Sequence, residues 1–191
     1  MDYLTKGNWE TGPDVYLFNL PIAKTCRPTA WCKENCYGKK GNYKRFERSI
    51  GRALDKRYEL SLSDEFAETI TKEIFRRKIS LVRVHVTGDF YSKKYVRRWI
   101  QIAKNCPQTL FRTTTKRRDL ADVILELHLL PNFNIRESLD PSRPELAMGL
   151  PLAAIETLEI AADFFRGARD CRKCAYVCWH QKDSNYCFPE I

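Results

Sequence analysis

Three cysteines near the N-terminus carry the clearest chemical signal in the sequence. Five residues separate Cys26 from Cys32, and three separate Cys32 from Cys36. They follow the apolar, aromatic run Val15–Leu20, which predicts a strand ending at Pro21, so we expect them on the loop that leaves this strand. Structural zinc normally takes four protein ligands, whereas three thiolates leave one iron of a cluster open. The pattern favours an iron–sulfur site over structural zinc or ordinary buried cysteines.

A second group of cysteines lies near the C-terminus. Its spacings are two, three and eight residues, between Cys171, Cys174, Cys178 and Cys187. Four thiolates suit both a closed zinc site and an iron–sulfur cluster. We predict a second metal centre at these four positions. The remaining Cys106, at an expected helix end, is interpreted as an ordinary residue.

The composition describes a soluble globular protein. The chain has 191 residues, of which 43% are hydrophobic and 30% charged, and no apolar run approaches the roughly 20 residues of a membrane span. The N-terminus lacks the hydrophobic segment of a signal peptide. We therefore expect a cytoplasmic protein without a membrane partner. Because disulfides are rare in the cytosol, eight cysteines indicate metal or redox chemistry.

The net charge of +9 and the pI of about 9.2 favour polyanionic partners. Within the basic segment 39–57, four cations recur every fourth residue and would form one stripe on a helix: Lys44, Arg48, Arg52 and Lys56. Such a stripe is either a phosphate-binding face or simply a solvated surface.

Strand and helix patterns alternate along the chain. Strands are predicted at Leu81–Thr87, Thr109–Thr115 and Phe133–Leu139, with a weaker one at Leu150–Ile155. Helices are predicted after the N-cap candidates Ser63 and Ser92 and around Leu120–Leu127. This order implies βαβ units and a parallel sheet.

The predicted strands each carry a polar face, which a sheet covered on both sides would not need. These polar positions include Arg83, His85, Arg112, Asn134 and Arg136. A partial (β/α)5-6 barrel of mostly parallel strands explains them, with the apolar face on outer helices and the polar face lining a cavity. The three arginines suit an anionic substrate, such as a nucleotide or nucleic acid. His85 is equally consistent with a structural and a catalytic role.

Gly88 and Asp89 end the predicted strand Leu81–Thr87. In barrels of this kind the chemistry lies at the carboxyl ends of the strands. The cysteine loop is expected at the same edge of the sheet, so the two features indicate one site.

The motifs FNLP, TC-x5-C-x3-CY, VHVTGDFYS and CxxC…CW, from about Phe18 to Cys187, resemble the phage gene product 88 family. Their layout is similar to that of the radical S-adenosylmethionine (SAM) superfamily, although the usual cysteine spacing there is three and then two residues. The resemblance implies that Cys26, Cys32 and Cys36 bind a [4Fe-4S] cluster whose fourth iron SAM chelates. It also implies that Gly88 and Asp89 hold the SAM amino group, in place of a glycine-rich motif with glutamate.

The resulting prediction is a radical-SAM-like enzyme with two [4Fe-4S] clusters, SAM, an anionic substrate and an electron donor. Trp31 and Tyr37, each beside a cysteine, would pack against the adenine. The C-terminal cysteines resemble the auxiliary clusters of that superfamily. Residues 1–165 would form the barrel and 166–191 the second cluster segment. The alternatives are a non-catalytic nucleic-acid-binding protein with two structural metal sites, and a non-SAM iron–sulfur or redox protein.

Overall fold

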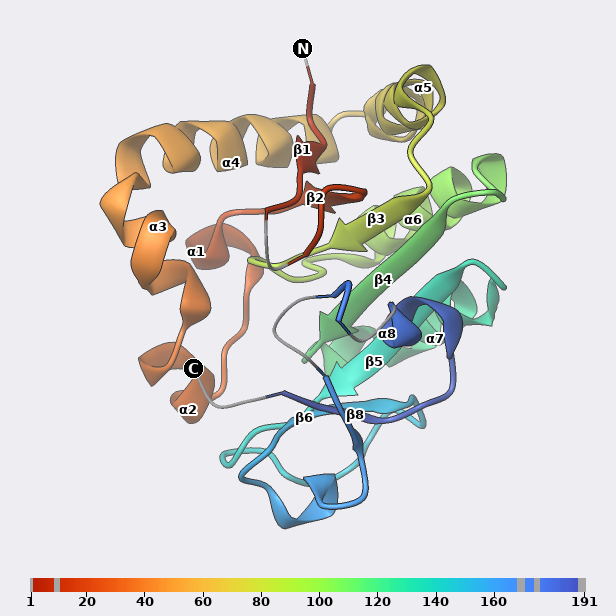
Figure 1. Cartoon of the computed structure of the whole chain (residues 1–191). Coiled ribbons are helices and arrows are strands. Elements are labelled where there is room, and N and C mark those ends of the chain that lie inside the picture. The colour runs from red at the N-terminus through yellow and green to blue at the C-terminus, as the bar shows by residue number, and fades with distance from the viewer. Residues whose placement is uncertain (1, 9–10, 168–170, 174–175, 189–191) are drawn as a thin grey trace.

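A mixed, mostly parallel sheet forms the centre of the molecule (Figure 1). The computed structural model describes residues 2–8, 11–167, 171–173 and 176–188. Within them, eight strands lie in the order β1-β2-β3-β4-β5-β6-β8-β7. Their bounds are β1 Thr5–Lys6, β2 Val15–Phe18, β3 Leu81–Val84, β4 Leu110–Thr115, β5 Phe133–Ser138, β6 Leu152–Ile155, β7 Phe165–Arg166 and β8 Tyr186–Phe188.

Only β1 pairs antiparallel among these strands; the other pairs are all parallel. From β1 to β6 the order in the sheet follows the order in the sequence, as successive βαβ units of one hand produce. The predicted α/β class with a mostly parallel sheet is confirmed. The described sheet has eight strands rather than five or six, because short strands extend it at both edges.

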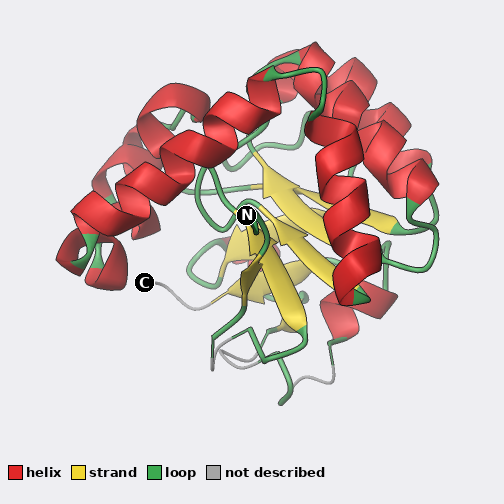
Figure 2. Ribbon diagram, turned by 90° about the horizontal axis from the view of Figure 1, so that it is seen from above, coloured by secondary structure: helices red, strands yellow, loops and turns green. Residues whose placement is uncertain are grey.

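The longer helices form an arc along one side of the sheet (Figure 2). The helices are α1 Ile22–Thr25, α2 Ala30–Glu34, α3 Gly41–Arg45, α4 Glu47–Leu62, α5 Phe66–Arg77, α6 Lys93–Asn105, α7 Ala121–Leu129 and α8 Val177–His180. Short 3-10 turns occur at Tyr37–Lys39, Arg118–Leu120 and Glu159–Ala161. Short α8 lies on the other side, against β4 (Figure 1).

The main core lies between the sheet and the helices. As predicted, Ser92 caps α6 by accepting a hydrogen bond from the backbone N–H of Tyr95 at 3.2 Å. The face of α6 that carries Tyr95 and Trp99 is fully buried. The Trp99 ring lies 5.4 Å from that of Phe18 in β2 and 5.5 Å from that of Phe66 in α5. Aromatic packing therefore fixes α5 and α6 against the strand that leads into the cysteine loop.

Two local predictions before β3 are wrong. Ser63 does not begin a helix: it ends α4, its hydroxyl donates to the Leu60 carbonyl, and α5 begins at Phe66. The basic segment is not one helix either, because Phe46 leaves the helical conformation between α3 and α4. Lys44 consequently lies on a different helix from the other three cations of the predicted stripe.

His85 is not on the polar face of β3. The strand ends at Val84, and His85 has a left-handed backbone with φ of 64°. This conformation breaks the alternation of a strand and turns the side chain into the helix-side core. There its Nε2 lies 2.9 Å from the Tyr95 hydroxyl, and its ring packs edge-on against Phe90.

Candidate metal centre

The ends of β2 and β3 press closely together at the carboxyl edge of the sheet. Gly88 has φ of +87°, and a Cβ there would lie 2.7 Å from the Leu20 Cβ and 3.0 Å from the Thr25 hydroxyl oxygen. Leu20 also donates its backbone N–H to the Thr87 carbonyl at 3.0 Å. A side chain at residue 88 would therefore push away the segment that leads into the cysteine loop.

Three thiols gather at this edge. Cys26 follows α1, Cys32 lies in α2, and Cys36 directly precedes a 3-10 turn. Burial, together with the nearby Asp89 carboxylate and the other two thiols, raises the pKa of Cys26 to about 12, while a Gly88 N–H donor opposes these effects. None of the three forms a disulfide with a described residue. The structure thus brings the predicted N-terminal ligands together beside Gly88 and Asp89.

A buried polar network ties the cysteine loop to the ends of β4 and β5. The Thr29 hydroxyl donates to Asp140 at 2.7 Å and accepts the backbone N–H of Cys32 at 3.1 Å. Lys116 forms a 2.8 Å ion pair with Asp140 and bonds the Ser138 hydroxyl at 2.9 Å. Burial works to raise the pKa of Asp140, but the hydrogen bonds from Lys116 and Thr29 outweigh it and lower that pKa. These contacts fix the position of α2.

The sequence alone did not predict this network. Lys116 and Asp140 directly follow strands that it predicted, and Thr29 stands at the N-cap position before the AWCKE segment. The positions of these residues at the ends of predicted strands and helices can be recognised in the sequence. The contact between Thr29 and Asp140 cannot, because the two residues are more than 100 positions apart.

Asp89 lies at the same edge and is almost completely buried. Its carboxylate accepts the Thr115 hydroxyl at 2.7 Å, the Lys116 backbone N–H at 3.0 Å and the Phe90 N–H at 2.7 Å. Burial raises its pKa, although these donors oppose that effect. A carboxylate offers about four acceptor sites, so one remains for a further donor.

Trp31 and Tyr37 lie on the same segment as the cysteines, and both are partly buried. The backbone N–H of Trp31 donates to the Ser142 hydroxyl at 2.9 Å. The Tyr37 ring packs edge-on against Tyr43 with centroids 5.6 Å apart. Their predicted contact with adenine stays a prediction.

The C-terminal segment covers the polar face of the sheet. Asn134 donates to the Trp179 carbonyl at 2.6 Å. Arg136 is fully buried and donates to the carbonyls of Ser184 at 2.8 Å, Gln181 at 2.6 Å and Cys178 at 3.3 Å. Both side chains were predicted to line a substrate cavity, but the structure places them beneath this segment, where they bind its backbone. Arg83 and Arg112 lie on the same face, directly opposite each other in β3 and β4.

The predicted C-terminal ligands are not all brought together. Cys178 is buried with Val15, Trp179 and Tyr186, whereas Cys187 is buried in a separate cluster with Leu152 and Ala154. Successive strand residues point to opposite faces, so Tyr186 and Cys187 cannot share one side. Cys174 lies outside the described residues, and Cys171 belongs to a described turn just before it.

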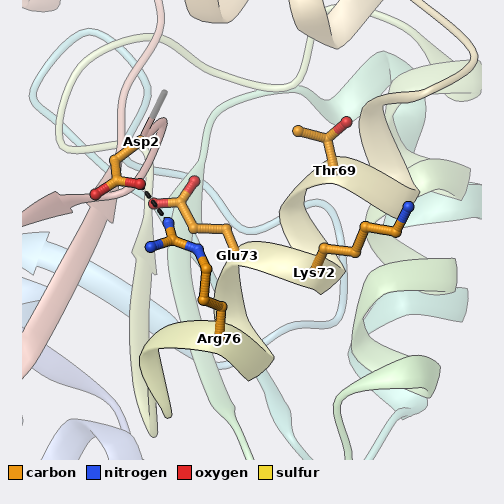
Figure 3. Close-up of a pocket in the computed structure, with 5 residues that line it drawn as sticks. All are labelled: Asp2, Thr69, Lys72, Glu73 and Arg76. Carbon is orange, nitrogen blue, oxygen red and sulfur yellow. Dashed lines mark hydrogen bonds and ion pairs between the residues drawn. The ribbon is translucent and has the colours of Figure 1, made fainter.

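A surface depression elsewhere has no link to these residues. It is lined by Asp2, Thr69, Lys72, Glu73 and Arg76 (Figure 3). Arg76 pairs with Asp2, and Glu73 accepts the backbone N–H groups of Tyr3 at 2.8 Å and Leu4 at 3.0 Å. Its charged groups therefore attach the N-terminal segment to α5, and the candidate site remains the cysteine loop.

Within the described residues, no three His, Cys, Asp or Glu side chains are arranged to share a single metal ion. Each thiolate of an iron–sulfur cube binds a different iron, so its ligands stand farther apart than those of one ion. The arrangement of Cys26, Cys32 and Cys36 is therefore not that of a mononuclear metal site.

The fold and this site together define an α/β protein with a thiol-rich loop at the carboxyl ends of parallel strands. The chain belongs to the gene product 88 family, whose family model matches residues 3–150. It is 28% identical over 179 residues to the "Gene 88 protein" of Mycobacterium phage L5. The aligned region covers 86% of this chain and 74% of that protein. The corresponding protein of Mycobacterium phage D29 is 26% identical over 179 residues, covering 86% and 73%.

No solved structure matches the chain significantly. Among the described residues, every helix is too short or too polar to cross a membrane.

Proposed function

We propose that this protein is an iron–sulfur enzyme resembling the radical SAM proteins. Cys26, Cys32 and Cys36 would bind a [4Fe-4S] cluster, SAM would occupy the open iron, and the substrate would be anionic. The observation that carries the proposal is the gathering of three partly buried thiols beside the buried Asp89 at the carboxyl edge of a parallel sheet. Chemistry in folds of this type belongs to that edge.

The electrostatics of the site support a cationic occupant. Three thiols and a carboxylate are partly removed from water in one place, and in the metal-free chain this raises the pKa of Cys26 and of Cys32. Iron cations would compensate the crowded thiolates. The Gly88 N–H directed at Cys26 is the type of donor that tunes the potential of a bound cluster.

Held by Cys26, Cys32 and Cys36 and reduced by an external electron donor, the cluster would supply the single electron that reductive cleavage of SAM requires. The side chains of this protein would position SAM and the cysteine ligands. Asp89 has one acceptor site left for the SAM ammonium. Thr29, Lys116 and Asp140 hold α2, and with it Cys32, at a fixed place on the sheet edge.

Anaerobic purification followed by spectroscopy tests this proposal. The purified chain should be brown, contain iron and acid-labile sulfide, and show an electron paramagnetic resonance signal that SAM shifts after reduction. Release of 5′-deoxyadenosine from SAM would establish the cleavage. Stoichiometric zinc without iron, or a reduced signal that SAM never changes, would refute the assignment.

A second observation favours a nucleic-acid partner, either as the substrate or as the sole ligand of a non-catalytic protein. Phe46, between α3 and α4, is 50% exposed. Around and beyond it lie five exposed cations, none of which forms an ion pair with a described residue: Lys44, Arg45, Arg48, Arg52 and Lys56. Several of them line a shallow depression together with Phe46. Unpaired cations around an exposed ring match phosphates and one stacked base.

The binding of a labelled single-stranded oligonucleotide tests this second function. Affinity should fall by roughly 100-fold between 50 and 200 mM salt if several phosphates are contacted. The variant Phe46→Ala/Arg48→Ala should bind clearly more weakly than the wild type. Arg97→Ala/Lys104→Ala removes two exposed cations from α6 and serves as the control. Equal losses in both variants would indicate only a general effect of charge.

A further inference from the structure

Two arginines lie side by side on the face of the sheet that the C-terminal segment covers. Neither forms an ion pair with a carboxylate of a described residue. Arg83 in β3 lies directly opposite Arg112 in β4. Arg112 is 3% exposed, and its Nε and Nη2 groups have no hydrogen-bond partner within the described residues. A buried charge that lacks a partner is strongly destabilising, and a second cation beside it increases that cost.

Arg136 on the neighbouring strand shows what a satisfied arginine on this face looks like. Carbonyl oxygens of the C-terminal segment accept from its Nε, Nη1 and Nη2 groups. Within the part of the chain that the structure describes, the partner recorded for the Arg112 guanidinium is the Phe188 ring, whose centroid lies 5.6 Å from the guanidinium carbon. A cation–π contact offsets part of a charge but accepts no N–H bond in the guanidinium plane. The difference between the two arginines points to an anionic group that accompanies Arg112.

The C-terminal cysteine segment supplies candidates for that group. Cys178 is buried on this face, where its own carbonyl accepts from Arg136 and α8 packs against β4. Burial, together with the positive charge of Arg112, lowers the pKa of Arg83 to about 10, while the Cys171 and Cys178 thiols act in the opposite direction. Both thiols are therefore within electrostatic reach of the arginine pair.

We propose that Arg83 and Arg112 provide the counter-charge for an anionic metal–thiolate centre that Cys171 and Cys178 help to hold against β3 and β4. A metal centre ligated by several thiolates carries net negative charge, because each thiolate contributes one. The centre would be the second iron–sulfur cluster, so this inference rests on the iron–sulfur part of the proposed function. It assigns the two arginines to that centre rather than to the substrate.

The substitution Arg112→Met keeps most of the side-chain volume and removes the charge. In the anaerobically purified full chain it should reduce iron from two clusters to about one per chain, and the remaining signal should still respond to SAM. In a Cys178→Ala background, which lacks the second centre, the same substitution should raise Tm by about 3 °C, because it removes an uncompensated buried charge. The change in Tm that Arg112→Met causes should therefore have opposite signs in the wild-type and Cys178→Ala backgrounds.

Arg83→Met is the second variant, because Arg83 is only partly buried and its loss leaves no large cavity. It should also lower iron at the second centre, whereas the exposed control Arg97→Met should change nothing.

If Arg112→Met lowers Tm in both backgrounds with full iron, the arginine is only a packing residue and the proposal fails. If phosphate raises the Tm of the wild type but not of Arg112→Met, without dependence on iron, the site binds a free oxyanion and the cluster assignment is wrong.

The proposed function has a separate readout. Its failure would appear as the absence of a SAM-responsive signal from the site of Cys26, Cys32 and Cys36. That signal does not involve Arg112.

Discussion

The two cysteine-bearing segments lie in opposite electrostatic surroundings. The N-terminal thiols gather beside the carboxylates of Asp89 and Asp140, and the nearby cations Lys116 and Arg117 are already paired with Asp140 and Asp119. In the C-terminal segment, Cys178 is buried on the sheet face that carries Arg83 and Arg112, and Cys171 and Cys178 both act to raise the pKa of Arg83. Negative surroundings disfavour an added electron and positive ones favour it. The same ligand type would therefore give a strongly reducing centre at one end and an electron-accepting centre at the other.

The two segments are also held in different ways. Side-chain networks at strand ends fix the N-terminal loop, through Thr29, Lys116 and Asp140. The C-terminal segment is held through its backbone, by carbonyls that bind Asn134 and Arg136. Changes at the loop should therefore act on one centre without disturbing the other.

Removing one thiol from each segment gives the largest expected effect. Cys32→Ala should abolish the SAM-responsive signal and leave the second centre, and Cys178→Ala should do the reverse. Because Cys187 packs in a separate cluster, Cys187→Ala should keep both centres. Iron, sulfide and electron paramagnetic resonance measure these outcomes, and buried Cys106→Ala is the matched control.

Loss of both signals in either single variant would contradict the separation of the two regions. Loss of the second centre in Cys187→Ala would mean that the segment rearranges around a metal.

The next effect concerns the network behind the N-terminal loop. Asp140→Asn leaves the Lys116 ammonium, whose side chain is only 15% exposed, without its carboxylate. Breaking a pair as buried as this should lower the free energy of unfolding by about 3 kcal/mol, measured by urea denaturation. Iron at the N-terminal site should fall while the second centre stays loaded.

Asp122→Asn is the control for that experiment. It breaks an ion pair with Lys93 in which both side chains are about half exposed, so less than about 1 kcal/mol should be lost. Similar losses in the two variants would mean that the network at the sheet edge has no special structural role.

The reduction potentials of the two proposed centres provide a finer comparison. We expect the C-terminal centre to have the higher midpoint potential, by roughly 60 mV or more, which is about a tenfold difference for one electron. Arg83→Met should lower that potential and narrow the gap, because it removes a nearby positive charge. A redox titration followed by electron paramagnetic resonance measures both values. Equal midpoint potentials in the wild type would contradict the proposal that the two centres lie in electrostatically different surroundings.

Much of the framework could be predicted because its signals are local. The burial of Tyr95 and Trp99 follows from helical spacing after the Ser92 cap, and the β4 and β5 strands follow from apolar alternation. Because parallel strands place their carboxyl ends at one edge, the sequence alone predicts that the cysteine loop lies beside Gly88 and Asp89.

The failures come from interactions that a local pattern does not contain. His85 has a left-handed backbone. Its side chain therefore lies on the opposite face of the sheet from the one that strand alternation predicts. The pairing of Thr29 with Asp140 joins distant parts of the chain. The C-terminal segment covers the polar face by presenting backbone carbonyls to Arg136, and a carbonyl has no signature in the sequence.

The smallest expected effect uses pH, because the chain contains one buried histidine, His85, and one partly buried histidine, His128. Burial lowers the pKa of His85 from 6.5 to about 3, and burial together with Lys182 lowers that of His128 to about 4. Below pH 6.5 the unfolded chain binds protons at these positions that the folded chain refuses, so stability is complete above about pH 7 and falls on acidification. Between pH 7 and 5.5, His85 should account for a loss of about 1 kcal/mol and the more exposed His128 for less. Urea unfolding across this range measures the slope. His85→Asn, which tolerates the left-handed backbone, should flatten it more than His128→Asn does, whatever each costs in absolute stability. An unchanged slope in His85→Asn would mean that His85 accepts a proton in the folded protein, and its burial behind the N-terminal site would then be incomplete.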